Sequence, residues 1–143
     1  MLVSPTINNV HGRILSITGT DPAAGAEISE IVPARRRWRF HGIRFTLITD
    51  VNVADRTVYL QISDGTNVLI FITHTQTQAA SITRSYNFHP RPDAASTIST
   101  QISIPLPYFT LGAGYGIITS TNNIQVGDQF SAIHLLAEEW IDP

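Results

Sequence analysis

The residues that could bind a metal ion or transfer protons are scattered along this chain. No two histidines have the i,i+4 or His-x-His spacing that places two imidazoles on one ion. Glu138 and Glu139 are adjacent, so on a strand they point to opposite faces and cannot act as a paired acid and base. Asp64-Gly65 and Asp128 fit turns, because no series of oxygen ligands surrounds them. The sequence therefore predicts no metal site at any of the five histidines, which are His11, His41, His74, His89 and His134.

Signals for nucleophilic catalysis and for phosphate binding are also weak. Serine and threonine are abundant, but no Gly-x-Ser-x-Gly elbow singles out a nucleophile. The run GAGYG, which begins at Gly112, lacks the Lys-Ser/Thr pair and the helix of a phosphate-binding loop, so a turn is the simpler interpretation. The sequence therefore predicts a protein that is not an enzyme and that holds no cofactor.

One basic cluster does indicate a binding surface. Arg35, Arg36, Arg37 and Arg39 surround Trp38, and on a strand Arg35, Arg37 and Arg39 would share one face. Such a stripe of arginines suits phosphate, a sulfated glycan or an acidic protein surface. The alternative is a solvated face whose arginines pair with Asp or Glu of a neighbouring strand.

Aromatic residues give two further candidates. Tyr108, Phe109 and Tyr115 lie in a long connection, where they could form a platform for a sugar or a lid on the end of the fold. Trp140 lies three residues before the end of the sequence, and we expect it to be anchored in the core or at a subunit boundary.

Charge is scarce in the composition. Asp, Glu, Lys and Arg make up 14% of the residues, against roughly 25% in an ordinary soluble domain. With 43% hydrophobic residues, this favours surfaces that associate, although a β-domain covered by Thr, Ser, Asn and Gln is the alternative. The net charge of -2 provides no electrostatic reason to bind nucleic acid or an anionic membrane. Without cysteine there can be no disulfide, so stability must come from packing.

Short strands separated by turns account for nearly the whole sequence. We count eight or nine, among them TISTQISI (from Thr97), and take PLPYFTLGAGYG (from Pro105) as a connection. These strands predict an all-β fold, an antiparallel β-sandwich of jelly-roll or related Greek-key type. We expect an N-terminal arm over residues 1–11 and one sandwich domain over 12–143. No secretory signal and no apolar run of membrane-spanning length is present, so we expect a soluble chain.

Two local patterns are specific enough to place features. Trp38 and Phe40 share one strand face, but Ile43 and Phe45 continue the apolar alternation one residue out of phase, which predicts a bulge or corner at His41-Gly42. Asp64-Gly65 separates two strand patterns and predicts a hairpin between them.

Two blocks of the sequence resemble small virion structural proteins of tailed bacteriophages. In the first, IVPARRRWRFHGIRFTLITDVNVADRTVYLQISDG, a proline precedes a basic-aromatic strand, a Thr-Asp turn, an Arg-Val strand and an Asp-Gly turn. In the second, LGAGYGIITSTNNIQVGDQFSAIHLLAEEWIDP, a glycine loop precedes Gly-Asp-Gln and a terminal Glu-Glu-Trp.

This resemblance implies a jelly-roll subunit, expected to be a homotrimer, in a virion assembled in the host cytoplasm. We expect a non-enzymatic capsid decoration or cement protein that stabilises the head lattice, with the major capsid protein and copies of itself as partners. Neither nucleic acid nor a membrane is expected as a partner. The alternative is a head-fibre, spike or tail-fibre module that binds a host-surface glycan. The expected contact residues are Arg35, Arg36, Arg37, Arg39 and Trp140.

Overall fold

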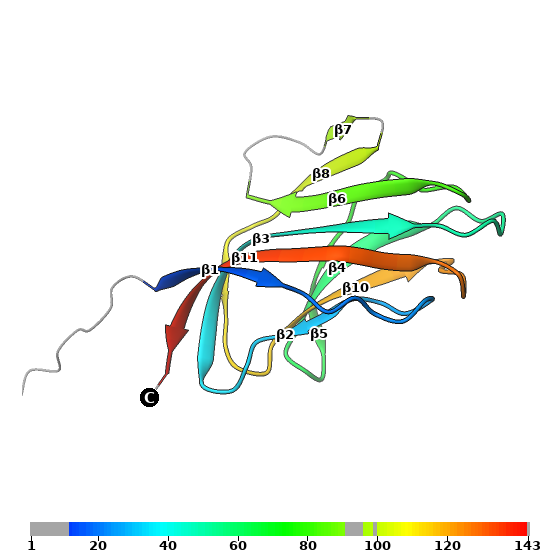
Figure 1. Cartoon of the computed structure of the whole chain (residues 1–143). Helices are drawn as coiled ribbons and strands as arrows, with labels where there is room; N and C mark the ends of the chain where they lie inside the picture. Colours follow the sequence, from blue (N-terminus) through cyan, green and yellow to red (C-terminus); the bar gives the residue numbers. More distant parts are fainter. Residues whose placement is uncertain (1–11, 91–95, 99, 143) are drawn as a thin grey trace, which may run out of the picture.

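Every regular element in the described part of the chain is a β-strand (Figure 1). The structure is a computed structural model, and it describes residues 12–90, 96–98 and 100–142. Within these residues no helix is long and apolar enough to cross a membrane. The expected arm over residues 1–11 lies outside the described residues. The strands are β1 (Arg13–Thr18), β2 (Ser29–Ile31), β3 (Arg36–Ile48), β4 (Thr57–Ser63), β5 (Val68–Ile72), β6 (Thr83–His89), β7 (Ser96–Ile98), β8 (Gln101–Pro105), β9 (Phe109–Leu111), β10 (Gly116–Asn122) and β11 (Gln129–Ile141).

The strands form two sheets whose inner faces share one core (Figure 1). The larger sheet has the order β1-β11-β3-β6-β8-β7, with β9 also paired to β3, and the smaller sheet has the order β2-β10-β4-β5. Four antiparallel pairs, β1 with β11, β2 with β10, β3 with β6 and β4 with β5, alternate between the two sheets. This is the strand arrangement of a jelly roll. The predicted all-β sandwich is confirmed.

The described strands number eleven, more than the eight or nine predicted. TISTQISI is not one strand, because it divides into β7 and β8, which pair with each other. The expected connection PLPYFTLGAGYG contains β9, whose Leu111 packs into the core and whose backbone pairs with the first half of β3. The sheets are also not wholly antiparallel, since β8 runs parallel to β6.

Aromatic side chains fill the centre of the core. The Phe45 ring stacks on Tyr86 and Phe88 at centroid distances of 5.4 and 5.9 Å, and meets Phe130 edge-on at 5.5 Å. These four residues come from β3, β6 and β11 of the larger sheet. The smaller sheet contributes buried aliphatic side chains to the same core, among them Val58, Leu60, Ile62 and Ile117.

The bulge predicted at His41-Gly42 is present in β3. Phe40 pairs with Ala137 and Gly42 pairs with Leu136, so His41 has no partner on β11. The extra residue shifts the alternation, which is why Phe40 and Ile43 are both buried. A side chain at position 42 would begin 2.9 Å from the carbonyl oxygen of Phe88, so glycine is required by this close approach of β6.

The predicted hairpin at Asp64-Gly65 is also confirmed. It joins β4 to β5 through a four-residue loop between the paired residues Ser63 and Val68. The Asp64 carboxylate accepts hydrogen bonds from the backbone N–H groups of Asn67 and Thr66, and these bonds lower its pKa. Gly65 has a φ of 95°, a conformation that favours glycine.

A buried ion-pair network ties the connection between β3 and β4 to the turn before β11. The fully buried Arg56 side chain donates to Asp128 at 2.9 and 3.0 Å and to Asp50 at 2.7 Å. Asp128 also accepts hydrogen bonds from the backbone N–H groups of Asp50 and Gln125. Burial by itself would raise the pKa of Asp128, but these hydrogen bonds outweigh it and lower that pKa. The sequence-based interpretation of Asp128 as a turn residue is therefore incomplete, because its carboxylate also pairs with a buried arginine.

Candidate functional site

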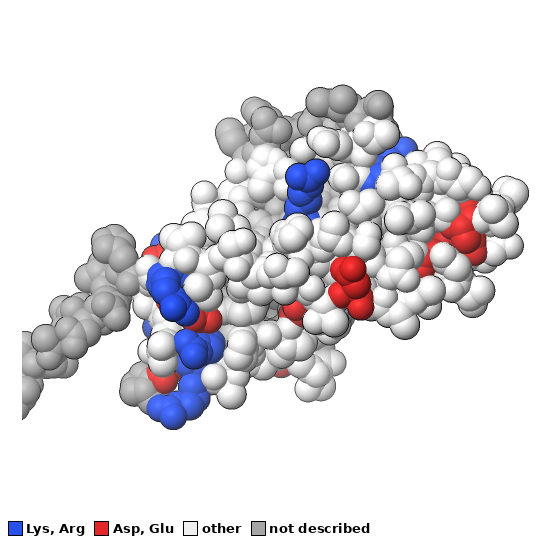
Figure 2. Space-filling model, viewed as in Figure 1, with Lys and Arg blue, Asp and Glu red and all other residues white. Residues whose placement is uncertain are grey.

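The arginine cluster lies at one end of the larger sheet. Figure 2 shows arginine side chains gathered where β1, the beginning of β3 and the end of β11 meet. Arg36 and Arg13 contact the buried Glu139 carboxylate at 3.1 and 3.3 Å, and the indole N–H of Trp38 donates to it at 2.9 Å. This side of the cluster is therefore occupied by a carboxylate of the same chain.

The outer side of the cluster is paired as well. Arg37 contacts Asp142 at 3.3 Å and Arg39 contacts Glu138 at 3.5 Å. Both guanidinium groups lie over the ring of Trp140, at 5.6 and 5.3 Å from its centroid. Trp140 is half-buried on the outer face and is not part of the core, so the first of its two expected anchors is not met, while an anchor at a subunit boundary stays a prediction.

Arg35 differs in its position from Arg36, Arg37 and Arg39. It precedes β3, in a turn where its φ is 59°, so it does not share a strand face with Arg37 and Arg39 as the sequence predicted. Its carbonyl accepts the backbone N–H of Asp142, and its side chain is exposed. For Arg36, Arg37 and Arg39 the structure thus shows the alternative interpretation, in which the arginines pair with acidic residues of the same chain. Those acidic residues lie on β11 and at the residue that follows it. Their role as contact residues stays a prediction.

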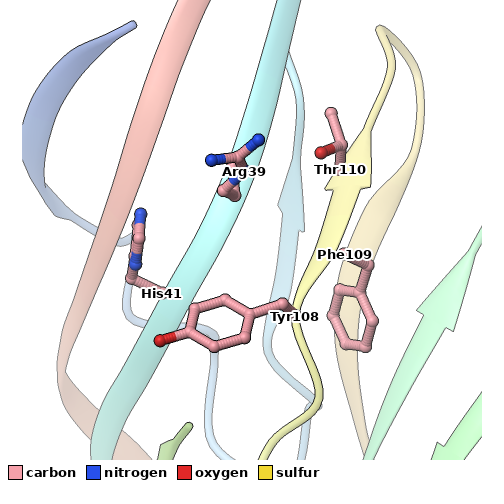
Figure 3. A pocket seen from close by; sticks show the side chains of 5 residues that line it. All are labelled: Arg39, His41, Tyr108, Phe109 and Thr110. Carbon is pink, nitrogen blue, oxygen red and sulfur yellow. The ribbon is translucent and has the colours of Figure 1, made fainter. Parts of the chain in front are cut away.

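A hollow of about 570 Å³ lies beside the cluster, where β9 meets β3 (Figure 3). Tyr108 is 67% exposed, and its ring extends toward His41, which it meets edge-on at 5.9 Å. Phe109 points to the other side and stacks on the core residue Phe40. Tyr115 also packs against the core. Two of the three aromatic residues thus cover the core, and Tyr108 alone offers a free ring to a ligand.

A second hollow, of about 270 Å³, lies on the outer face of the same sheet and shares His41 with the first. Arg44 lines it and is paired in register with His134 on β11 and with Asn87 on β6. His89 and Gly42 also line it. These residues do not form a recognisable group in the sequence, because they become neighbours only through strand register. The phase slip at His41-Gly42 was the one sequence signal that pointed to this place.

The smaller sheet presents a different kind of surface at its edge strand, β5. Val68, Leu69, Ile70 and Phe71 are all between 38% and 60% exposed, and no described strand pairs with the outer edge of β5. Unpaired N–H and C=O groups on such a strand are open to pairing with another chain. We call these four residues the β5 edge.

Next to the β5 edge, the outer face of the smaller sheet carries no charge on its two central strands. Val58, Leu60 and Ile62 of β4 point into the core, as do Ile117 and Thr119 of β10. Side chains alternate along a strand, so the intervening positions face outward. Those positions are Thr57, Tyr59, Gln61, Ser63, Gly116, Ile118, Ser120 and Asn122.

The described residues contain no group of three or more His, Asp or Glu side chains that could hold a metal ion.

Comparison with known proteins identifies no relative. No family model, no curated protein and no solved structure matches this chain.

Proposed function

We propose that this chain is a non-enzymatic structural subunit of a tailed-bacteriophage particle, a capsid decoration or cement protein that binds the head lattice and copies of itself. The observation that carries the proposal is the β5 edge beside an uncharged sheet face. The resemblance of the sequence to small virion proteins and the jelly-roll arrangement of the strands support it.

The low cost of desolvation favours contact through this surface. Removing water from charged side chains is expensive, whereas apolar and neutral polar groups lose it at low free-energy cost. The β5 edge has four exposed apolar side chains and no charge, and the outward positions of β4 and β10 have none either. Natural edge strands are commonly protected by lysine, proline or a charge, and β5 has none of these. A surface of this kind suits lasting contact with another protein.

We expect the β5 edge to join copies of this chain, with a homotrimer as the product. Replacing Leu69 or Phe71 by aspartate would place a carboxylate in that contact and should prevent association. Light scattering after size exclusion should give wild-type protein about three times the 15.7 kDa of one chain, and each variant the mass of one chain.

Val53→Asp is the matched control, because Val53 is 98% exposed in the connection between β3 and β4, away from β5. It should leave the mass of the oligomer unchanged. A monomeric wild-type protein, or Leu69→Asp and Phe71→Asp variants that keep the wild-type mass, would contradict a contact at the β5 edge.

The function itself is tested by counting copies of the chain on purified phage particles. Quantitative mass spectrometry should find many copies per head, in a fixed ratio to the major capsid protein. Absence from the particle would refute the proposal. A few copies confined to one vertex or to the tail would favour the second candidate.

That second candidate is a head-fibre, spike or tail-fibre module that binds a host-surface glycan. The exposed ring of Tyr108 beside Arg39 and His41 favours it, because sugars stack on aromatic rings and accept hydrogen bonds from such side chains. This hollow lies on the larger sheet, so it leaves the β5 edge free.

A further inference from the structure

The two hollows on the larger sheet share one lining residue, His41. Arg39, His41 and Tyr108 line the first hollow, and Arg44, His89 and His134 line the second. We call these six residues the His41 groove. Five of the six carry nitrogen groups that can donate hydrogen bonds, and the sixth carries the exposed aromatic ring.

The bulge in β3 explains why a groove forms here. The first half of β3 pairs with β9 up to Phe40, and the second half pairs with β6 from Ile43 onward. His41 and Gly42 lie between these two pairings. Gly42 lines the second hollow, and His41 lines both.

The electrostatics of the groove favour an anion. No Asp or Glu is among the described residues that line either hollow. The nearest carboxylate that contacts lining residues is Glu138, at 3.5 Å from Arg39 and 4.0 Å from His41, and it already accepts a hydrogen bond from the backbone N–H of Gly12. Arg44 makes no hydrogen bond or ion pair with any described residue, so no described carboxylate offsets its charge.

A second unused group points to the same place. The Nε2 atom of His41 is buried and has no hydrogen-bond partner among the described residues. Buried polar atoms are normally satisfied, so a ligand hydroxyl at this point would complete the hydrogen bonding of His41. The same Nε2 atom lies 4.0 Å from the Glu138 carboxylate, which favours a hydroxyl over an anion here, and the His41 ring meets Tyr108 edge-on.

We infer that the His41 groove binds an acidic oligosaccharide. One sugar ring lies against Tyr108, a hydroxyl reaches His41, and a sulfate or carboxylate group of a neighbouring sugar binds Arg44 and His134. Aromatic stacking needs a ring with an apolar face, and a guanidinium prefers an oxyanion, so a neutral sugar or a simple anion would use only half of the groove. This ligand deepens the second candidate function, which uses the same hollow, and it does not rest on the proposed role in head decoration.

Isothermal titration of the full chain with a heparin-derived tetrasaccharide, which carries both sulfate and carboxylate groups, tests the inference. The uncharged maltotetraose and inorganic sulfate should each bind at least about tenfold more weakly, because each lacks one of the two kinds of contact. Arg44→Gln and Tyr108→Ala should each weaken binding of the tetrasaccharide by about tenfold or more.

Arg13→Gln is the matched control, since it removes the same charge from an exposed position outside both hollows, and binding should stay within about twofold of wild type. Melting temperatures close to wild type would show that the variants fold. The inference is overturned if the tetrasaccharide does not bind or if maltotetraose or sulfate binds as tightly. Full affinity in both groove variants would overturn it too, and so would equal binding of a thymidine oligonucleotide, which would indicate a phosphate-backbone site.

Discussion

Replacing Asp128 by alanine should lower the free energy of unfolding by about 3–5 kcal/mol, the range measured when one partner of a buried ion pair is removed. Arg56 would keep its charge in a fully buried position with Asp50 as its remaining acidic partner. The backbone N–H groups of Asp50 and Gln125 would also lose their acceptor. Urea unfolding followed by tryptophan fluorescence measures the loss.

Asp55→Ala is the control for this substitution. Asp55 is exposed in the same connection, so its removal changes the net charge equally and should alter stability by less than about 0.5 kcal/mol. If Asp128→Ala does not yield folded protein, Asp128→Asn keeps the shape of the side chain and permits the measurement. Equal stability of the Asp128 and Asp55 variants would show that the network does not stabilise the fold.

The same network makes stability depend on pH. The pKa of Asp128 is lowered below its ordinary value of 3.8 in the folded chain, so on acidification the unfolded chain takes up a proton first. The stabilisation by Asp128 is therefore complete above about pH 5 and declines as the pH falls through the folded pKa. The stability difference between wild type and Asp128→Asn should shrink over that acidic range. A difference that stays constant would contradict the lowered pKa.

Gly42→Val should destabilise the chain by about 1–3 kcal/mol, because the new side chain would press against the backbone of β6. Its Cβ would start 2.9 Å from the Phe88 carbonyl oxygen, and a backbone atom cannot swing away as a side chain does. In an ordinary strand position valine would improve on glycine. Thermal unfolding of the variant measures the sign of the effect directly.

Thr46→Val provides the comparison, since Thr46 pairs with Ser131 on β11 and with Ser85 on β6 and carries a side chain of nearly the same size as valine. It removes one part-buried hydrogen bond, between the hydroxyl groups of Thr46 and Ser85, and should lower stability by no more than about 1 kcal/mol. A Gly42→Val protein that melts at or above the wild-type temperature would mean that the approach of β6 to Gly42 is not close.

Features encoded by neighbouring residues could be predicted from the sequence. The bulge at His41-Gly42 shows as a phase slip in a period-two pattern, and the hairpin at Asp64-Gly65 shows as a turn dipeptide between two strands. Both patterns are local. The sandwich class followed from the number of strands and the lack of helical periodicity.

What the sequence could not show depends on contacts between distant segments. The parallel pairing of β6 with β8 and the addition of β9 to β3 leave no local pattern. The partner of Arg56 is Asp128, far along the chain, so each residue by itself resembles an ordinary turn residue. The arginines of β3 look free in the sequence, although β11 brings Glu138 and Glu139 beside them.

The central proposal is that the chain binds a phage head by burying uncharged surface, and adding purified protein back to stripped heads tests it most directly. The measurement is the number of copies that sediment with each head at about 50 mM and about 200 mM salt. Because burial of uncharged surface is insensitive to ionic strength, we predict the same number of copies at both concentrations. Heads that take up no protein, or that lose it at the higher salt, would contradict the account.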